Sequence, residues 1–231
     1  MISVCMTTYN GEKYLRGQVD SILGQLSNED ELIISDDGST DSTIRILESY
    51  NDSRIKILHN TKNHGVNGNF ENALINAKGD YIFLSDQDDV WHNNKVRVCI
   101  SALDKYDCIV HDCEITDSEL NIISNSLFKE LGAKSGVINN LKKNGFTGCC
   151  MAFKKSVLNS VIPFPKSERF FHDQWIGLRA SMKFKTAFIN QKLIYFRRHS
   201  SNSSSAAGKS KLNILNKIYY RILLCKALIF N

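Results

Sequence analysis

The chain has 231 residues, of which 42% are hydrophobic and 23% are charged, as is typical of a single globular α/β domain. Seven cysteines without a Cys-x-x-Cys pair argue against a disulfide framework, and no apolar run reaches about 18 residues, which argues against a membrane-spanning helix. The net charge of +5 is uneven, because Lys183 to Asn231 holds ten Lys or Arg and no Asp or Glu, so that the first 182 residues carry −5. We therefore expect the C-terminal part to contact an anionic partner such as nucleic acid, a phosphorylated substrate or an acidic membrane surface.

The first part of the chain alternates short β-rich runs with amphipathic segments. We expect, in chain order, a strand, helix, strand, helix, strand, helix and strand over Ile2–Thr7, Glu12–Leu26, Glu31–Ser35, Thr43–Tyr50, Arg54–Leu58, Asn69–Ala77 and Tyr81–Ser85. This alternation predicts a mostly parallel sheet with helices on both faces. Ligands bind such sheets beyond the carboxyl ends of the strands.

The second part is less regular. We expect a helix, a strand, a hairpin-like stretch, a strand, a helix and two strands over Lys95–Leu103, Cys108–His111, Glu114–Ile123, Gly148–Phe153, Gln174–Met182, Thr186–Ile189 and Leu193–Phe196. Ser200–Gly208 is a polar, Ser-rich link. Apolar residues then recur at helical spacing from Leu212 to Leu223 with Lys and Arg between them, which predicts a basic amphipathic helix.

Acidic clusters follow two of the predicted strands. A glycine turn and a helix N-cap explain Ser39–Asp41 but not Asp36 and Asp37, which can accept hydrogen bonds from a base or a ribose. In Asp86–Asp89, three carboxylates within four residues repel one another and require a compensating cation. Oxygen ligands at this density suit Mg²⁺ or Mn²⁺, whereas a helix cap accounts for Asp89 alone.

Two further clusters lie in the second part. His172-Asp173-Gln174-Trp175 fits the start of a capped helix, with Asp173 as the N-cap. Arg197-Arg198-His199 fits a solvated basic loop, although Arg matches phosphate geometry and neutral imidazole binds Mn²⁺.

The ordered series of motifs over the first ~100 residues resembles the family 2 glycosyltransferases, and such a series is more specific than any one motif. The matching segments are Val4–Asn10, Gly11–Leu15, Asp36–Asp41, Gly79–Ile82 and Asp86–Asp89. The resemblance implies the GT-A fold, an α/β Rossmann-like sheet flanked by helices. It implies a metal-dependent enzyme that moves a sugar from a UDP- or dTDP-sugar to an acceptor hydroxyl with inversion, similar to rhamnosyl- and galactosyl-type transferases of bacterial surface polysaccharides.

The resemblance also implies roles for individual residues. Asp173 is the general base, and whether His172 assists it, tunes its pKa or binds the acceptor stays open. Asp88 is implied to bind the metal, with Asp86 and His199 as further ligands. Contacts with the donor nucleotide and its diphosphate fall to Thr7, Tyr9, Asp36, Asp37, Asp86 and Arg198.

From these roles we expect three parts in the chain. Residues 1–105 form the nucleotide-sugar-binding half of one domain, residues 106–200 form its acceptor-binding half, and residues 201–231 form a linker and the basic helix. A lipid-linked glycan acceptor, in O-antigen or capsule synthesis, would explain that helix as a peripheral contact with the inner face of a bacterial membrane. Packing on the domain, or a dimer contact, explains it equally well. The first residues lack a secretory leader, so we expect a cytoplasmic protein that does not bind nucleic acid.

Two rival functions remain at this point. A nucleotidyltransferase would also use carboxylates and Mg²⁺, but it would carry a Gly-rich loop with Arg and Lys where this chain has Thr7–Gly11. A non-enzymatic membrane- or nucleic-acid-binding module would use the basic tail and leave the acidic clusters without a purpose.

Overall fold

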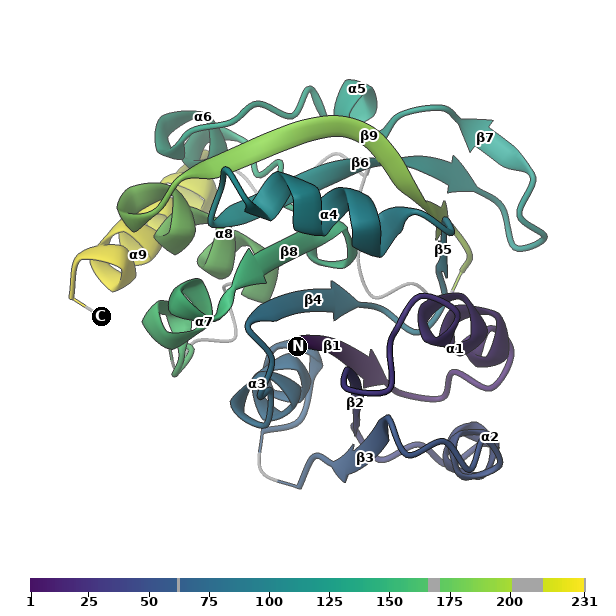
Figure 1. Cartoon of the computed structure of the whole chain (residues 1–231). Helices are drawn as coiled ribbons and strands as arrows, with labels where there is room; N and C mark the ends of the chain where they lie inside the picture. Colours follow the sequence, from purple (N-terminus) through teal and green to yellow (C-terminus); the bar gives the residue numbers. More distant parts are fainter. Residues whose placement is uncertain (62, 166–170, 201–213, 231) are drawn as a thin grey trace.

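A single mixed sheet forms the centre of the molecule (Figure 1). The computed structural model describes residues 1–61, 63–165, 171–200 and 214–230. Within these residues the strand order is β3-β2-β1-β4-β8-β6-β9-β5, and β7 pairs with β6. The strands are β1 (Ile2–Thr8), β2 (Glu31–Asp36), β3 (Ile55–His59), β4 (Tyr81–Ser85), β5 (Val90–Trp91), β6 (Cys108–Thr116), β7 (Ile122–Ser124), β8 (Met151–Lys154) and β9 (Thr186–Arg197).

The four strands of the first part are parallel, as the alternation predicts. Strands β1 and β2 are buried along nearly their whole length, as expected of central parallel strands covered on both faces. In register, Thr8 pairs with Asp36 and Met6 pairs with Ser85. The carboxyl ends of β1, β2 and β4 therefore lie at the same end of the sheet, where the acidic clusters begin.

The second part adds strands of both directions. Strand β8 is antiparallel to both β4 and β6, whereas β9 is parallel to β6. The hairpin expected over Glu114–Ile123 is present as β6 and β7. The structure has one strand, β9, in place of the two short strands expected after residue 185. The pairing of β9 with β6 is irregular beside His111 and Asp112, and this irregularity accommodates the polar residues in the middle of β9. Gly148–Cys150 forms a 3₁₀ turn (η1), so β8 is shorter than the strand expected there.

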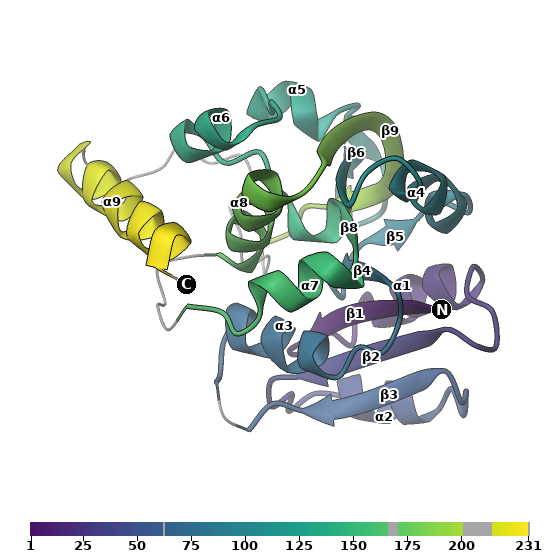
Figure 2. The ribbon, with the colours of Figure 1, turned by 60° about the vertical axis from the view of Figure 1, so that its left-hand side comes forward.

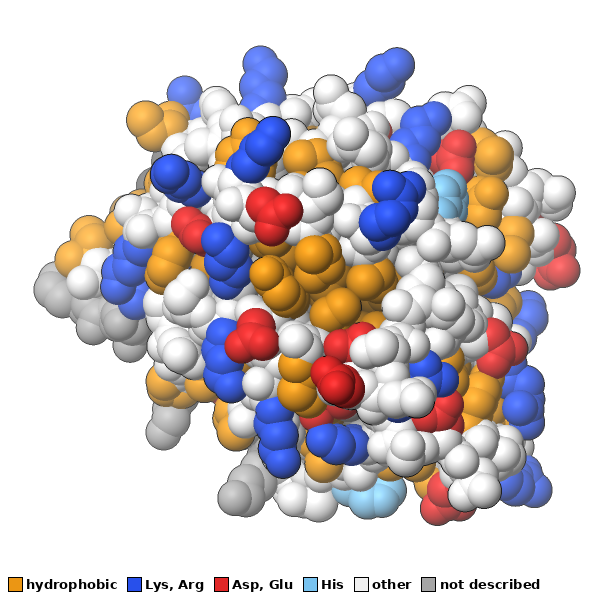
Figure 3. Space-filling model, in the orientation of Figure 1, with side chains coloured by type: hydrophobic (Ala, Val, Ile, Leu, Met, Phe, Trp, Pro, Cys, Tyr) orange, Lys and Arg blue, Asp and Glu red, His pale blue; other side chains and the backbone are white. Residues whose placement is uncertain are grey.

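Helices cover both faces of the sheet (Figure 2), and charged and hydrophobic side chains are interspersed over the face of the molecule seen in Figure 3. Helices α3, α7 and α8 lie on one face, and α1, α2 and α4 lie on the other. Helices α5, α6 and α7 were not expected from the sequence, and α8 begins at His172, so Asp173 lies in its first turn and is not its N-cap. The helices are α1 (Leu15–Leu23), α2 (Thr43–Glu48), α3 (Val66–Ile75), α4 (Lys95–Leu103), α5 (Leu127–Leu131), α6 (Val137–Lys142), α7 (Lys155–Val161), α8 (His172–Lys183) and α9 (Ile214–Phe230).

The expected C-terminal helix is α9, and it packs on the domain. Leu224 and Leu228 are buried, and the backbone carbonyl of Leu228 accepts a hydrogen bond of 3.1 Å from Arg179 in α8. Arg221 donates to backbone carbonyls of α6. The expected link at Ser200–Gly208 lies, beyond its first residue, outside the described residues. Among the described helices, none combines the length and the apolar character that a membrane crossing requires.

Candidate active site

The loop after β2 is held together by Asp36. The buried Asp36 carboxylate accepts hydrogen bonds from the Thr8 hydroxyl at 2.8 Å and from the Gly38 and Ser39 N–H groups at 3.0 and 2.8 Å. The Ser39 hydroxyl donates a fourth, at 2.5 Å. These contacts fix the loop at the carboxyl edge, so the Asp36 side chain shapes the predicted nucleotide pocket from within the protein.

The next residue, Asp37, faces a different segment. Its carboxylate accepts hydrogen bonds from Asn60 at 2.8 Å and from the Gly65 N–H at 2.7 Å. His64 Nδ1 lies 3.0 Å from the same carboxylate. Asp37 therefore ties the loop after β2 to the start of α3.

A second clamp holds the loop after β1. The Gln87 side chain accepts a hydrogen bond from the Tyr9 N–H at 2.9 Å and donates one to the Tyr9 carbonyl at 3.0 Å. Tyr9 itself is largely exposed, whereas Thr7 is half-buried within β1. A Cβ atom on Gly11 would lie 2.2 Å from Gln87 Oε1, so any other residue here would displace the Gln87 side chain. The loop after β4, which carries the acidic cluster, therefore holds the Tyr9 backbone in place at the end of the sheet.

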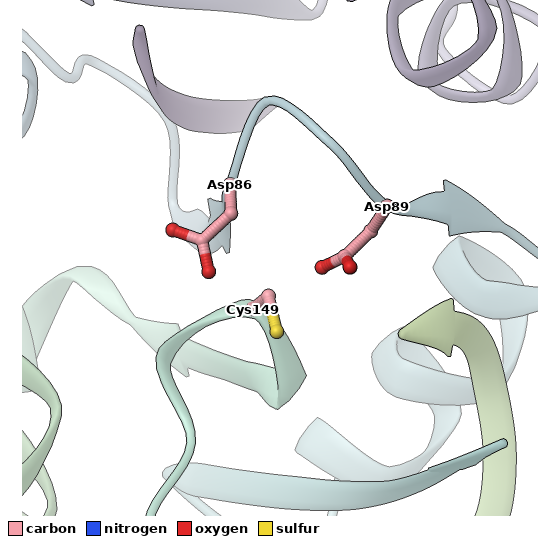
Figure 4. Close-up of side chains that lie close together, drawn as sticks. All are labelled: Asp86, Asp89 and Cys149. Carbon is pink, nitrogen blue, oxygen red and sulfur yellow. The ribbon is translucent and has the colours of Figure 1, made fainter. Parts of the chain in front are cut away.

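The acidic cluster after β4 is compact. Carboxylate oxygens of Asp86 and Asp89 and the Cys149 sulfur lie within 4.8 Å of one another (Figure 4). Burial, together with the charges of Asp88 and Asp173, raises the pKa of Asp86 to about 7. Burial also raises the pKa of Asp88 and of Asp89, so without a cation these groups tend to keep their protons.

Asp88 faces the end of β9. Its Oδ2 atom lies 2.9 Å from His199 Nε2, although the two residues are 111 positions apart in the chain. The Arg197 guanidinium donates to the Asp88 carbonyl at 2.7 Å and lies 4.5 Å from the Tyr14 ring, and the Tyr14 ring also contacts the His199 imidazole. The fold thus brings together the carboxylate and the imidazole predicted to bind metal.

Arg198 points elsewhere. Its guanidinium forms an ion pair with Glu130 of α5 at 2.8 Å. The neighbouring Arg197 is the arginine that reaches the acidic cluster. The predicted contact of Arg198 with the donor diphosphate would require this ion pair to open.

Asp173 stands on a third element, the first turn of α8. Burial raises its pKa to about 7, and the backbone N–H groups of Gln174 and Gly148 oppose that rise. Its charge is close enough to raise the pKa of Asp86, which places both carboxylates in one site. The His172 ring is buried and stacks on Phe70 with ring centroids 4.0 Å apart, and burial lowers its pKa to about 3. His172 is therefore neutral near pH 7.

Several residues of this site had no specific signal in the sequence. Gln87 and Arg197 sit inside motifs that drew attention to their neighbours. Cys149 lay in an expected strand, and Tyr14 lay in the expected helix Glu12–Leu26. Lys95 is fully buried, donates to the Cys149 carbonyl at 2.8 Å and lies 3.9 Å from the Trp91 ring. The four-residue spacing of Trp91 and Lys95 in the sequence gives no reason to expect a buried ammonium group beside carboxylates.

Chemically, the site offers three kinds of group at one edge of the sheet. Carboxylates and an imidazole, such as those of Asp86, Asp88 and His199, are groups that can hold a divalent cation. The loop after β1, with the exposed side chain of Tyr9, lies beside them. A separate carboxylate with a pKa near neutrality, Asp173, can accept a proton at physiological pH.

Comparison with known proteins agrees with this arrangement. The model of the family described as Glycosyl transferase family 2 matches residues 3–162. The chain is 29% identical over 214 residues to the Escherichia coli UDP-Glc:alpha-D-GlcNAc-diphosphoundecaprenol beta-1,3-glucosyltransferase WfgD, covering 91% of this chain and 81% of the relative. It is 28% identical over 243 residues to the dTDP-rhamnosyl transferase RfbG of Shigella flexneri, covering 94% of this chain and 81% of the relative.

A solved structure shows the same fold. The S. aureus TarS fragment 1–349 in complex with UDP-GlcNAc superposes with a TM-score of 0.75 at 19% identity. The match covers 99% of this chain and 66% of that one, so the chain spans about two thirds of TarS 1–349. These matches favour a transferase over a nucleotidyltransferase or a non-enzymatic module. The chain belongs to glycosyltransferase family 2 and is a glycosyltransferase with the GT-A fold.

Proposed function

We propose that this enzyme transfers a sugar from a UDP- or dTDP-sugar to a hydroxyl of a lipid-linked glycan, with inversion and with the help of Mn²⁺ or Mg²⁺, in O-antigen or capsule synthesis. The observation that carries the proposal is the convergence of three distant segments. Asp86 and Asp88 follow β4, His199 follows β9, and Asp173 opens α8.

The cation would be held by Asp88, Asp86 and His199. The fit is supported by the 2.9 Å contact between Asp88 and His199 and by raised carboxylate pKa values that a cation would reverse. Such a cation neutralises the charge that develops on a departing diphosphate. Arg197, fixed on the Asp88 carbonyl, keeps the loop that carries these ligands in place.

Asp173 is proposed as the general base. It takes the proton from the acceptor hydroxyl while the acceptor oxygen bonds to the anomeric carbon and the bond to the diphosphate breaks. A single base on the side opposite the leaving group gives direct displacement, which inverts the anomeric centre. Because its pKa is near 7, Asp173 can accept a proton near neutral pH and release it afterwards.

The two halves of the domain divide the substrates in this proposal. Residues 1–105 bind the donor through Thr7, Tyr9 and the loop that Asp36 and Asp37 hold in place. Residues 106–200 bind the acceptor near Asp173. The proposal for Arg198, a diphosphate contact, requires it to leave Glu130 when the donor binds.

The lipid-linked acceptor and a peripheral membrane position are supported by two observations. WfgD acts on a diphosphoundecaprenol-linked sugar by name. Helix α9 buries one face on the domain and exposes Tyr219, Ile222 and Ile229 on another, in a segment rich in Lys and Arg. Such a face suits the interface of an anionic membrane at the cytoplasmic side.

Nucleotide binding tests the proposed function. Calorimetry and thermal shift would measure UDP, dTDP and GDP binding with and without Mn²⁺ to the wild type, Asp88→Ala and, as a control, Asp104→Ala at the exposed end of α4. We expect one nucleotide to bind the wild type and the control only with metal, and Asp88→Ala to lose that binding. Equal binding by Asp88→Ala, or no binding of any nucleotide with metal, would contradict the proposal.

A further inference from the structure

Cys149 lies between two carboxylates of the acidic cluster. Its sulfur and one oxygen each from Asp86 and Asp89 are mutually within 4.8 Å. Cys149 and Asp89 are 0% and 1% exposed, while Asp86 is half-buried and opens the cluster to solvent. The Asp86 and Asp89 carboxylates, on the turn between β4 and β5, are directed toward each other, and Cys149 of η1 lies beside them (Figure 4). The 3₁₀ turn, and not the strand expected there, carries Cys149 at this position.

One atom of this cluster lacks the partner that its burial demands. Asp89 Oδ1 accepts a hydrogen bond of 3.0 Å from the Arg197 N–H, but the buried Asp89 Oδ2 has no hydrogen-bond partner among the described residues. Buried carboxylate oxygens in native proteins are almost always paired with a donor or a cation. Figure 4 shows the carboxylate that carries this oxygen directed toward Asp86, with Cys149 beside them.

Charge and ligand chemistry define which ion would fit the cluster of Asp86, Asp89 and Cys149. With Cys149 as a thiolate, the three ligands carry three negative charges, and the buried ammonium group of Lys95, which donates to the Cys149 carbonyl, offsets one of them. The remaining charge matches a divalent cation. A thiolate with two carboxylates favours a thiophilic ion such as Zn²⁺ over Mg²⁺, which prefers oxygen ligands alone.

We propose that Asp86, Asp89 and Cys149 form a second cation site, selective for Zn²⁺-like thiophilic ions and separate from the Asp88–His199 pair. On binding, the Cys149 S–H bond breaks, the proton passes to solvent and a sulfur–metal bond forms. The existence of this site does not depend on the proposed function. The effect of this site on activity does rest on the proposed function. Because Asp86 serves both sites, an ion bound by Cys149 withdraws Asp86 from the donor-binding cation and inhibits sugar transfer.

Cadmium alone is the probe, because a Cd²⁺–thiolate bond absorbs in the ultraviolet. The full chain, freed of metal, would be titrated with Cd²⁺ as wild type, Cys149→Ser and Cys150→Ser, the last being the adjacent buried thiol. We expect the wild type and Cys150→Ser to develop the same band with one Cd²⁺ per chain, and Cys149→Ser to lose it. A band that survives in Cys149→Ser overturns the proposal, as does one lost equally from both variants.

Two further variants separate this site from the proposed donor site. Asp89→Asn should weaken Cd²⁺ binding at least about 10-fold, since even an indirect partner of a metal is worth that much. Asp88→Ala should keep the Cd²⁺ band while losing metal-dependent nucleotide binding. Loss of the band in Asp88→Ala would mean that there is one site, not two. Circular dichroism and melting temperature of each metal-free variant exclude misfolding as the cause of a lost band.

Discussion

At the scale of single residues, environment gives the aspartates their different properties. Asp36 is buried and receives four hydrogen bonds. Asp86 and Asp173 are raised to a pKa of about 7, chiefly by burial. The motifs identified these residues as candidates, but short acidic motifs in a sequence do not reveal which carboxylates are solvated, paired or protonated.

Replacing Asp173 by Asn tests the general base. The amide has the same shape but accepts no proton, so we expect the transfer rate kcat to fall by about 10²–10⁴-fold. Metal-dependent binding of the donor nucleotide should stay at the wild-type level, because Asp173 stands on α8 rather than on the donor loops. Steady-state kinetics and calorimetry measure the two effects. A variant within a few-fold of wild-type kcat would assign the base to another residue.

At the scale of elements, the chain's own patterns predict the regular part well. The strands β1, β2 and β4 begin and end within about one residue of their expected bounds, because continuous apolar runs bounded by polar residues have few other solutions. The short helices α5, α6 and α7 were missed, since five to seven residues carry too little periodicity to detect. The two strands expected after Lys185 are one, because pairing with β6 overrides local polarity.

Two glycines at the start of the chain make a matched test of the loop after β1. Gly11 faces Gln87, so Gly11→Ala should push that amide off Tyr9, lower the melting temperature and weaken donor binding. Gly17 lies in α1 and is exposed, with its nearest neighbour 3.9 Å from an added Cβ, so Gly17→Ala should stabilise by about 0.5–1 kcal/mol. Denaturant unfolding and nucleotide binding report both. Similar effects of the two substitutions would show that the Gln87 clamp is unimportant.

At the scale of the whole molecule, the sheet assembles an acidic cluster from segments that are distant in the chain. The turn after β4, the end of β9 and the start of α8 meet there, and η1 closes it. Helix α9 reaches the same region, where the Tyr220 hydroxyl donates to the Gln174 side chain beside Asp173. Burying several carboxylates together makes stability depend on pH and on cations.

Stability should therefore fall as the pH rises through the window from about 4 to about 7. Asp173 has a usual pKa of 3.8 and a folded pKa of about 7, so the folded chain holds more protons than the unfolded chain between these values, and unfolding becomes easier as they are lost. Asp86 acts in the same direction. Without metal, we expect a melting temperature several degrees lower at about pH 8 than at about pH 5, given about 2–4 °C per kcal/mol for a chain of this size.

The control for this pH effect is Asp173→Asn, which should show a smaller drop between the two pH values. Saturating Mn²⁺ should raise the melting temperature at the higher pH in the wild type, because it stabilises the charged carboxylates. Scanning calorimetry at both pH values measures the melting temperatures of the wild type, of Asp173→Asn and of the wild type with Mn²⁺. A wild type that is more stable at the higher pH without metal would show that these carboxylates are already compensated.

The sequence by itself determined the order of strands and helices in the first part, the end of the sheet at which the acidic clusters gather, and the family. These follow from local hydrophobic pattern and from short motifs, which fold the same way wherever they stand. The family resemblance placed His199 with Asp88, and the structure has them in contact. Only the tertiary structure decided that Arg197 and not Arg198 reaches the acidic cluster, and that Cys149 lies beside Asp86 and Asp89. The reason is that these contacts join residues 60 or more positions apart, and local sequence patterns do not record which distant side chains meet.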